Sequence, residues 1–267
     1  MNRKSFELKL CFVLVCIIFA IFLGLPLGNL ALKSLQTGSG LGLANYQQML
    51  GNDKFLQAFG NSFVIASVEA LLTTVLAFFL AYGLHMTRLP HKIKEMLQLV
   101  IMMPMFLPSI TYGFAVIYSF GKQGLITRLL DTQLFPIYGF WGLLISYIIY
   151  TLPPAFLVLY NAFFYIDKNF ITVSKIMGDS TLRTFLMTSV RPLTGSLLAA
   201  FILSFFLSFT DFGIPVSIGG EYEVIAVELY MQMMGALPNF SNGSVIAVMM
   251  LIPSVISVVL LRYMEKC

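Results

Sequence analysis

The chain has 267 residues, of which 58% are hydrophobic and 10% are charged, and its mean hydropathy is +0.89. This composition excludes a soluble globular domain and indicates an integral membrane protein. The formal net charge is +4. The basic residues behind it are distributed as expected for the loops of a membrane protein, so the charge does not indicate a nucleic-acid partner.

Apolar stretches long enough to cross a bilayer recur along the whole chain. A helical span needs roughly 20 predominantly apolar residues. Six such stretches occur, at about residues 10–32, 61–84, 97–120, 138–160, 193–215 and 243–261. The first is longer than the roughly 7–15 residues of a signal-peptide core, so we expect it to remain as a span. The sequence therefore predicts an all-α integral membrane protein with six transmembrane helices in a single transmembrane domain, residues 1–267.

The lysines and arginines predict the orientation. Twelve of the 16 lie in the segments that share one side with the N-terminus: Arg3, Lys4, Lys9, Arg88, Lys92, Lys94, Lys168, Lys175, Arg183, Arg191, Arg262 and Lys266. Lys33, Lys54, Lys122 and Arg128 fall on the other side. Because cytoplasmic loops are enriched in basic residues, we expect both termini to be cytoplasmic in a cell-membrane, multi-pass protein.

A polar, helix-forming segment separates the fourth and fifth spans on the predicted cytoplasmic side. We call residues 166–192 the polar loop. Apolar residues recur at helical spacing before and after Gly178, and Asp179 or Ser180 is available to cap a second helix. Glycine readily adopts the left-handed turn that ends one helix and redirects the chain. The pattern predicts two short helices joined at Gly178, a knob suited to docking on a partner.

Two acidic residues lie within apolar stretches. Glu69 falls in the second span, and Asp211 falls near the outer end of the fifth. An ionised side chain at bilayer depth is costly, so it normally faces a cavity or a polar partner. Both residues are candidates for the outer half of a solute pathway. The alternatives are an interfacial Asp211 and a Glu69 that is satisfied by Ser or Thr on a neighbouring helix.

Enzymatic motifs do not occur in the sequence. It contains no G-x-x-x-x-G-K-[ST] phosphate-binding loop, which predicts that the chain does not hydrolyse nucleotide itself. His85 and His91 share one short inner loop and are expected to be solvated. We therefore assign no catalytic residue and no metal site.

The polar loop resembles the signature loop of binding-protein-dependent ABC importer permeases, which reads Glu-Ala-Ala-x-x-x-Gly followed after a spacer by Ile-x-Leu-Pro. Gly178 takes the position of the family's glycine, and Thr172-Val-Ser174 stands where Glu-Ala-Ala would be. The chain departs from the pattern at Thr172, which is not acidic, and at Pro192, which comes one residue late. The segments 199–215, 218–220 and 120–128 resemble the ferric-iron, 2-aminoethylphosphonate, thiamine and polyamine branch of that family.

The resemblance implies a permease with a translocation pathway and an ATPase-coupling loop. It assigns coupling to one set of residues: Thr172, Val173, Ser174, Lys175, Gly178, Asp179, Ser180 and Arg183. The pathway residues would be Glu69, Ser109, Tyr112 and Asp211. The implied partners are ABC ATPase subunits, an extracytoplasmic solute-binding protein, a second permease subunit or copy, and membrane lipid. ATP and Mg would be bound by the ATPase, and this chain would carry no cofactor.

Several alternatives stay open on the sequence. A secondary, ion-coupled transporter or a non-transport membrane scaffold would also present six apolar spans. The substrate, the choice between a homodimer and a heterodimer of permeases, and whether this unit is half of a fused permease are not readable from the chain.

Overall fold

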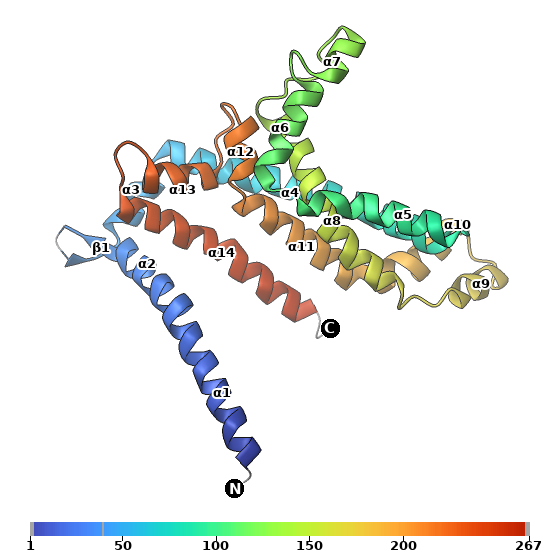
Figure 1. Cartoon of the computed structure of the whole chain (residues 1–267). Helices are drawn as coiled ribbons and strands as arrows, with labels where there is room; N and C mark the ends of the chain where they lie inside the picture. The colour runs from blue at the N-terminus through green and yellow to red at the C-terminus, as the bar shows by residue number, and fades with distance from the viewer. Residues whose placement is uncertain (1–2, 39, 265–267) are drawn as a thin grey trace. The chain divides into compact units, whose positions relative to one another are not determined.

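The computed structural model describes residues 3–38 and 40–264 (Figure 1). Lys266, which enters the orientation argument, and both chain ends, which are predicted to be cytoplasmic, lie outside the described residues. The first part of the chain contains α1 (Arg3–Phe19), η1 (Ala20–Gly24), α2 (Leu25–Leu35), β1 (Gln36–Thr37), β2 (Gly40–Leu41), α3 (Ala44–Leu50) and α4 (Asp53–Met86). The strands β1 and β2 form a short antiparallel hairpin.

The middle and last parts of the chain are also helical. They contain α5 (His91–Met102), η2 (Met103–Phe106), α6 (Ser109–Phe120), α7 (Leu125–Leu130), α8 (Phe140–Phe163), α9 (Asn169–Ile176), α10 (Thr181–Phe185), η3 (Leu186–Val190), η4 (Arg191–Leu193), α11 (Thr194–Thr210), α12 (Gly213–Ile218), α13 (Ile225–Met234) and α14 (Phe240–Met264).

Five helical stretches in the described part of the chain are long and apolar enough to cross a membrane. They are Leu8–Leu35, Asp53–Met86, Phe140–Phe163, Thr181–Thr210 and Phe240–Leu260. A sixth span exists if the bent pair His91–Phe106 and Ser109–Leu130 crosses as one. The structure is therefore an all-α fold with five or six candidate spans.

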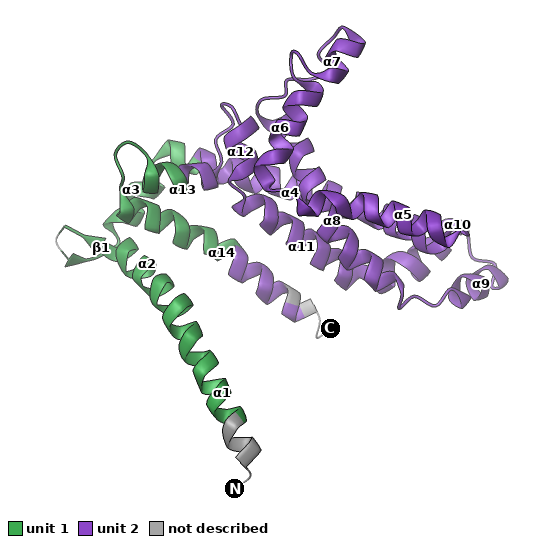
Figure 2. Cartoon of the chain, in the orientation of Figure 1, with its two compact units in different colours: residues 1–56, 229–253 green, residues 57–228, 254–267 purple. Residues whose placement is uncertain are grey.

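The chain divides into two compact units (Figure 2). The first comprises Met1–Leu56 and Leu229–Pro253, and the second comprises Gln57–Glu228 and Ser254–Cys267. The second unit contains the polar loop and every residue that the sequence analysis assigns to coupling or to the pathway.

The sequence predicts one continuous helix at residues 97–120, whereas the structure has two helices, α5 and α6, bent by 108° at a short break. Pro104 and Pro108 cause this difference, since proline lacks the N–H that would continue a helix. The freed carbonyl of Pro104 accepts hydrogen bonds from the Leu107 N–H, at 3.0 Å, and from the Tyr112 hydroxyl. The break therefore leaves the Pro104 carbonyl satisfied internally, as irregular backbone within a membrane would require.

The fifth predicted span, residues 193–215, also differs from the structure. The helix α11 ends at Thr210, and Asp211 has an extended backbone before α12 begins at Gly213. The Asp211 carboxylate accepts a hydrogen bond from the Ile214 N–H at 2.8 Å. This acid therefore caps a new helix where a continuous helix was expected.

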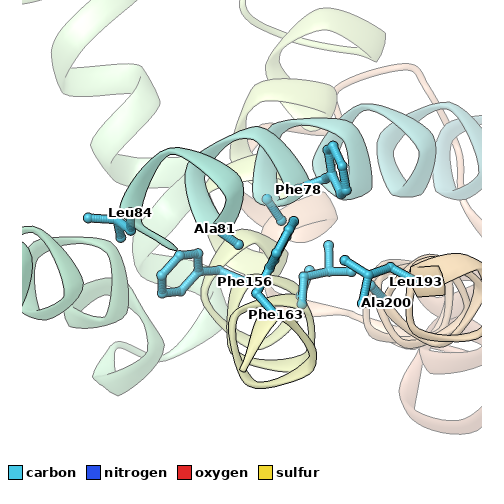
Figure 3. Packing of buried hydrophobic residues seen from close by; sticks show 10 residues of the cluster. Phe78, Ala81, Leu84, Phe156, Phe163, Leu193 and Ala200 are labelled. Carbon is cyan, nitrogen blue, oxygen red and sulfur yellow. The ribbon is translucent and has the colours of Figure 1, made fainter. Parts of the chain in front are cut away.

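Two hydrophobic clusters hold the second unit together. The first joins α4, α8, η4 and α11 through residues including Phe78, Phe156, Leu193 and Ala200 (Figure 3). The second joins α4, α6, α8 and α12 through residues including Tyr147 and Ile214. Together the clusters place α4 and α8 at the centre of this unit, with α6, α11 and α12 packed around them.

The helix α12 packs closely on α6 because Gly213 has no side chain. A Cβ built at Gly213 would lie 2.7 Å from the backbone nitrogen of Ile110 and would also meet the hydroxyl of Ser109. Backbone atoms cannot move aside as the end of a flexible side chain can. The close approach of these two helices therefore requires glycine at this position.

We expect Gly213→Ala to lower the free energy of unfolding by about 1–3 kcal/mol, because the added methyl group forces α12 away from α6. Thermal unfolding of the purified protein in detergent measures the change. Gly83→Ala in α4 is the matched control, since a Cβ at Gly83 meets nothing within 4 Å. Equal melting temperatures for the two variants would show that the α6–α12 contact does not need glycine.

Candidate functional site

The polar loop folds as two short helices joined by a glycine turn. The helix α9 stops because Gly178 is left-handed, with φ +82°. The Gly178 N–H donates to the Lys175 carbonyl and the Asp179 N–H donates to the Ser174 carbonyl, each at 3.1 Å. These bonds satisfy the last carbonyls of α9. A Cβ at Gly178 would meet nothing within 4 Å, so the turn requires glycine for its backbone angle and not for space.

A polar network fixes the two helices against each other. The Ser174 hydroxyl donates to Asp179 Oδ2 at 2.7 Å and lies 3.0 Å from the Thr184 hydroxyl. Asp179 Oδ1 pairs with Arg183 Nε at 3.2 Å. Ser180 is the N-cap of α10 and accepts from the Arg183 N–H at 3.3 Å. Ser174 is buried although α9 is otherwise mostly exposed, so this network sets the angle between α9 and α10.

The outer face of the loop is apolar. Ile176 is 80% exposed and Met177 is 77% exposed. Met177 lines a cavity of about 400 Å³ together with residues that include Phe170, Val173 and Met187. Thr172 and Lys175 are also exposed on α9. Large apolar side chains that face away from a protein's own core mark a binding surface.

The base of the loop is joined to the membrane helices by aromatic packing. The ring of Phe185, at the end of α10, lies 5.9 Å from Phe78 and 5.3 Å from Tyr82, both on α4. Phe185 packs against the cluster shown in Figure 3. At the start of the loop, Lys168 Nζ donates to the His85 carbonyl at the end of α4, at 2.8 Å. The loop is thus attached to α4 at both ends.

Glu69 is fully buried within the second unit, at 0% exposure. Its Oε1 accepts hydrogen bonds from Thr73 on its own helix, at 2.8 Å, and from Thr151 on α8. Ser208 on α11 also lies near this carboxyl group, and its hydroxyl donates to the backbone carbonyls of Ser204 and Phe205. Glu69 Oε2 has no hydrogen-bond partner among the described residues. The carboxyl group therefore lies at the junction of α4, α8 and α11, with one oxygen satisfied by threonines on α4 and α8.

The other three predicted pathway residues gather around the break after α11. The Asp211 carboxylate lies near the side chain of Ser109, at the start of α6. Tyr112 is buried, and its ring lies 5.4 Å from that of Tyr150 on α8. Asp211 itself is only partly buried. This group joins α6, α8 and α11 on the side of the unit where α12 begins.

Tyr147 on α8 is buried between the regions of the two acidic groups, and its phenol lies near both the Asp211 and the Glu69 carboxyl groups. The four predicted pathway residues are thus brought into one region of the second unit, whereas the coupling residues form a separate cluster in α9 and α10. The part of the chain that the structure describes holds no group of three or more His, Cys, Asp or Glu side chains suited to a metal ion.

The sequence analysis missed three residues that matter to these sites. Thr151 hydrogen-bonds Glu69 across a helix boundary, Ser208 approaches the same group, and Phe185 anchors the loop. Thr73 was detectable, because it lies one helical turn after Glu69. The partners on other helices gave no signal, since only tertiary packing brings them together.

These helices, with their broken spans and the helix–glycine–helix loop, define a multi-pass membrane protein with the fold of an ABC transporter chain. The structure matches a chain of the bacterial alginate ABC transporter solved with an alginate pentasaccharide-bound periplasmic protein. The TM-score is 0.82 at 13% identity, over 99% of this chain and 95% of that one. At this identity the likeness shows the fold alone.

The family model of the binding-protein-dependent transport system inner membrane component matches residues 73–266, and the chain belongs to this family. It is 27% identical over 222 residues to the ferric transport system permease protein FbpB of Actinobacillus pleuropneumoniae, covering 81% of this chain. It is 28% identical over 219 residues to the spermidine/putrescine transport system permease protein PotC of Escherichia coli K12, covering 80% of this chain and 76% of that protein. The chain spans 32% of the length of the ferric permease.

We expect Thr151→Val to lower the free energy of unfolding by roughly 1–2 kcal/mol, because it removes the hydroxyl that joins α8 to Glu69 and leaves a buried carboxyl group less satisfied. Thermal unfolding in detergent is the measurement. Thr74→Val is the control, since the Thr74 hydroxyl is buried without a hydrogen-bond partner among the described residues. If Thr151→Val is no less stable than Thr74→Val, the Glu69–Thr151 contact does not hold the helices together.

Proposed function

We propose that this chain is the permease subunit of an ATP-driven importer, and that the polar loop couples it to a separate ATPase. One observation carries the proposal. The loop presents an exposed apolar face on two short helices whose angle is fixed internally, and Phe185 anchors it to the α4–α8 core. A rigid element with a fixed base transmits a rigid-body displacement, whereas a flexible loop would absorb it.

The coupling residues have three different structural roles. Gly178 makes the turn, Ser174, Asp179, Ser180 and Arg183 hold its angle, and Thr172, Val173 and Lys175 face outward on α9. We propose that the exposed apolar face of α9, with Ile176 and Met177, docks on the ATPase. Closure of the ATPase pair would then push α10 and, through Phe185, the helices α4 and α8.

The orientation and domain organisation are part of the same proposal. The whole chain, residues 1–267, would form one permease domain with six spans, of which the bent pair α5 and α6 is the third. Both termini and the polar loop would be cytoplasmic, as the distribution of basic residues predicts. The loop that joins α6 and α7 would then lie on the outer side.

The partners follow from the family. An extracytoplasmic solute-binding protein would deliver the solute, and a second permease subunit, whether a copy or a relative, would complete the pathway. Because the sequence contains no phosphate-binding loop, we propose that ATP and Mg are bound and hydrolysed on the ATPase and not on this chain.

We propose a cationic or amine-bearing solute. The pathway would be lined by Asp211, Ser109 and Tyr112. Glu69, which is buried deeper in the same unit, would add negative electrostatic potential. The solutes for which the relatives are named, ferric iron and spermidine/putrescine, fit this charge. Ferric iron, aminoethylphosphonate, thiamine and polyamines remain the candidates, since selectivity in such systems resides largely in the binding protein.

The coupling role predicts the effect of Gly178→Val. A β-branched residue is strained at φ +82°, so the turn would open and displace α10. In proteoliposomes with its partners, solute uptake should fall about tenfold while ATP hydrolysis continues, so more ATP is used for each solute imported. Gly195→Val is the control, since a Cβ at Gly195 meets nothing within 4 Å and its φ is not positive.

If Gly178→Val imports solute at the parental rate and hydrolyses the same amount of ATP for each solute, the polar loop does not couple transport to the ATPase. Uptake that follows an ion gradient and needs no ATP would instead support a secondary transporter. A protein that shows no uptake with any of the candidate solutes would support a membrane scaffold.

The pathway role predicts the effect of neutralising the acids one at a time. Asp211→Asn keeps the shape and most of the hydrogen bonding, and we expect uptake of a cationic solute to fall by about fivefold with assembly intact. Glu69→Gln should also reduce uptake. Uptake at the parental rate in both variants would mean that the acids only shape the fold, and the inference toward a cationic solute would be abandoned.

A further inference from the structure

The turn that joins α6 to α7 lines a cavity that carries basic side chains. The cavity measures about 500 Å³, and its lining includes Lys122, Arg128, Tyr118 and Tyr138. An adjoining cavity of about 380 Å³ shares Lys122 and Arg128. Hydrogen bonds fix the turn beneath them, from the Gly124 N–H to the Gly121 carbonyl at 2.8 Å and from the Thr127 hydroxyl to the Phe120 carbonyl at 3.1 Å.

Neither cation is neutralised within the part of the chain that the structure describes. No ion pair there joins Lys122 or Arg128 to a carboxylate. Asp131 lines the adjoining cavity but is not paired with either of them. Two of the four basic residues on the predicted outer side thus face one opening, where positive charge is otherwise sparse. Such a pair suits an oxyanion, since arginine binds phosphate in bidentate fashion and lysine adds a point charge.

The helix α7 beside this cavity carries exposed apolar side chains next to the basic ones, a combination that indicates a lipid ligand. Figure 1 shows α7 directly beyond the end of α6. Its Leu125 is 68% exposed and its Leu129 is 75% exposed, and neither packs into a cluster of the second unit. Tyrosines at a membrane surface lie at the level of the lipid headgroups, with apolar residues deeper and basic residues beside the phosphates. Apolar, aromatic and basic groups occur together here.

We propose that Lys122 and Arg128 bind the headgroup phosphate of an outer-leaflet phospholipid, with its acyl chains against Leu125 and Leu129. The site makes α7 an interfacial anchor for the outer end of α6. This proposal rests on the proposed orientation of the chain. The favoured ligand is a lipid and not an acidic surface of the solute-binding protein, because exposed leucines flank the charges and a polar protein contact would leave them in water.

The test is native mass spectrometry of the full chain in detergent with added phosphatidylglycerol. We expect Lys122→Gln/Arg128→Gln to weaken lipid retention by about tenfold. Lys33→Gln/Lys54→Gln is the matched control, because it removes the same charge from the predicted outer side at residues that do not line the cavity. Diacylglycerol, which lacks the phosphate, should not be retained by any of the three proteins.

Equal retention by the two double variants, or retention of diacylglycerol equal to that of phosphatidylglycerol, would overturn the proposal. Displacement of the lipid by equimolar inorganic phosphate would show a site for free oxyanions and would also overturn it. Unchanged lipid retention in Lys122→Gln/Arg128→Gln, together with uptake that no longer depends on the solute-binding protein, would also overturn the proposal. Lipid retention is measured without transport, so a failure of the lipid proposal can be distinguished from a failure of the proposed function.

The orientation of the chain is checked separately by labelling a cysteine at Gln123 with an impermeant reagent, after the native cysteines are replaced.

Discussion

A loop transmits force between two proteins only if it is stiff and fixed at its base, and both properties belong to the segment between α8 and α11. The stiffness comes from the Ser174–Asp179–Arg183 network around a turn whose backbone angle requires Gly178. The fixed base comes from Phe185, which packs on Phe78 and Tyr82 of α4. Together they connect an exposed apolar surface to the central helices of the second unit.

The same unit breaks two of its apolar helices and satisfies backbone groups at each break internally. At the first break the Tyr112 hydroxyl and the Leu107 N–H satisfy the carbonyl of Pro104. At the second break Asp211 caps the helix that follows. Irregular backbone in a membrane is tolerated where protein groups or cavity water satisfy it. The two breaks, in α5–α6 and α11–α12, meet where α12 packs on α6, and the predicted pathway residues lie there.

The sequence predicted most of what depends on local pattern. The apolar stretches, the two helices of the polar loop and the turn at Gly178 each follow from residue type and spacing. The sequence offered Asp179 or Ser180 as the cap of the second helix, and the structure has Ser180 there. What depends on tertiary packing was not predictable. The side chain of Thr151 reaches Glu69 on a different helix, and the Tyr112 hydroxyl satisfies the Pro104 carbonyl that the break between α5 and α6 leaves free. Hydropathy alone does not distinguish a kinked span from a broken one.

The central claim is that the apolar face of α9 binds an ATPase. Ile176 is 80% exposed on that face, so a photoreactive amino acid there would contact the partner without disturbing the loop's network. Irradiation of native membranes and sequencing of the cross-linked product is the most direct measurement. The account predicts a product that carries the phosphate-binding loop of an ABC ATPase, and only lipid adducts from the same reporter at Phe114 on α6. Lipid adducts alone from both positions would contradict it.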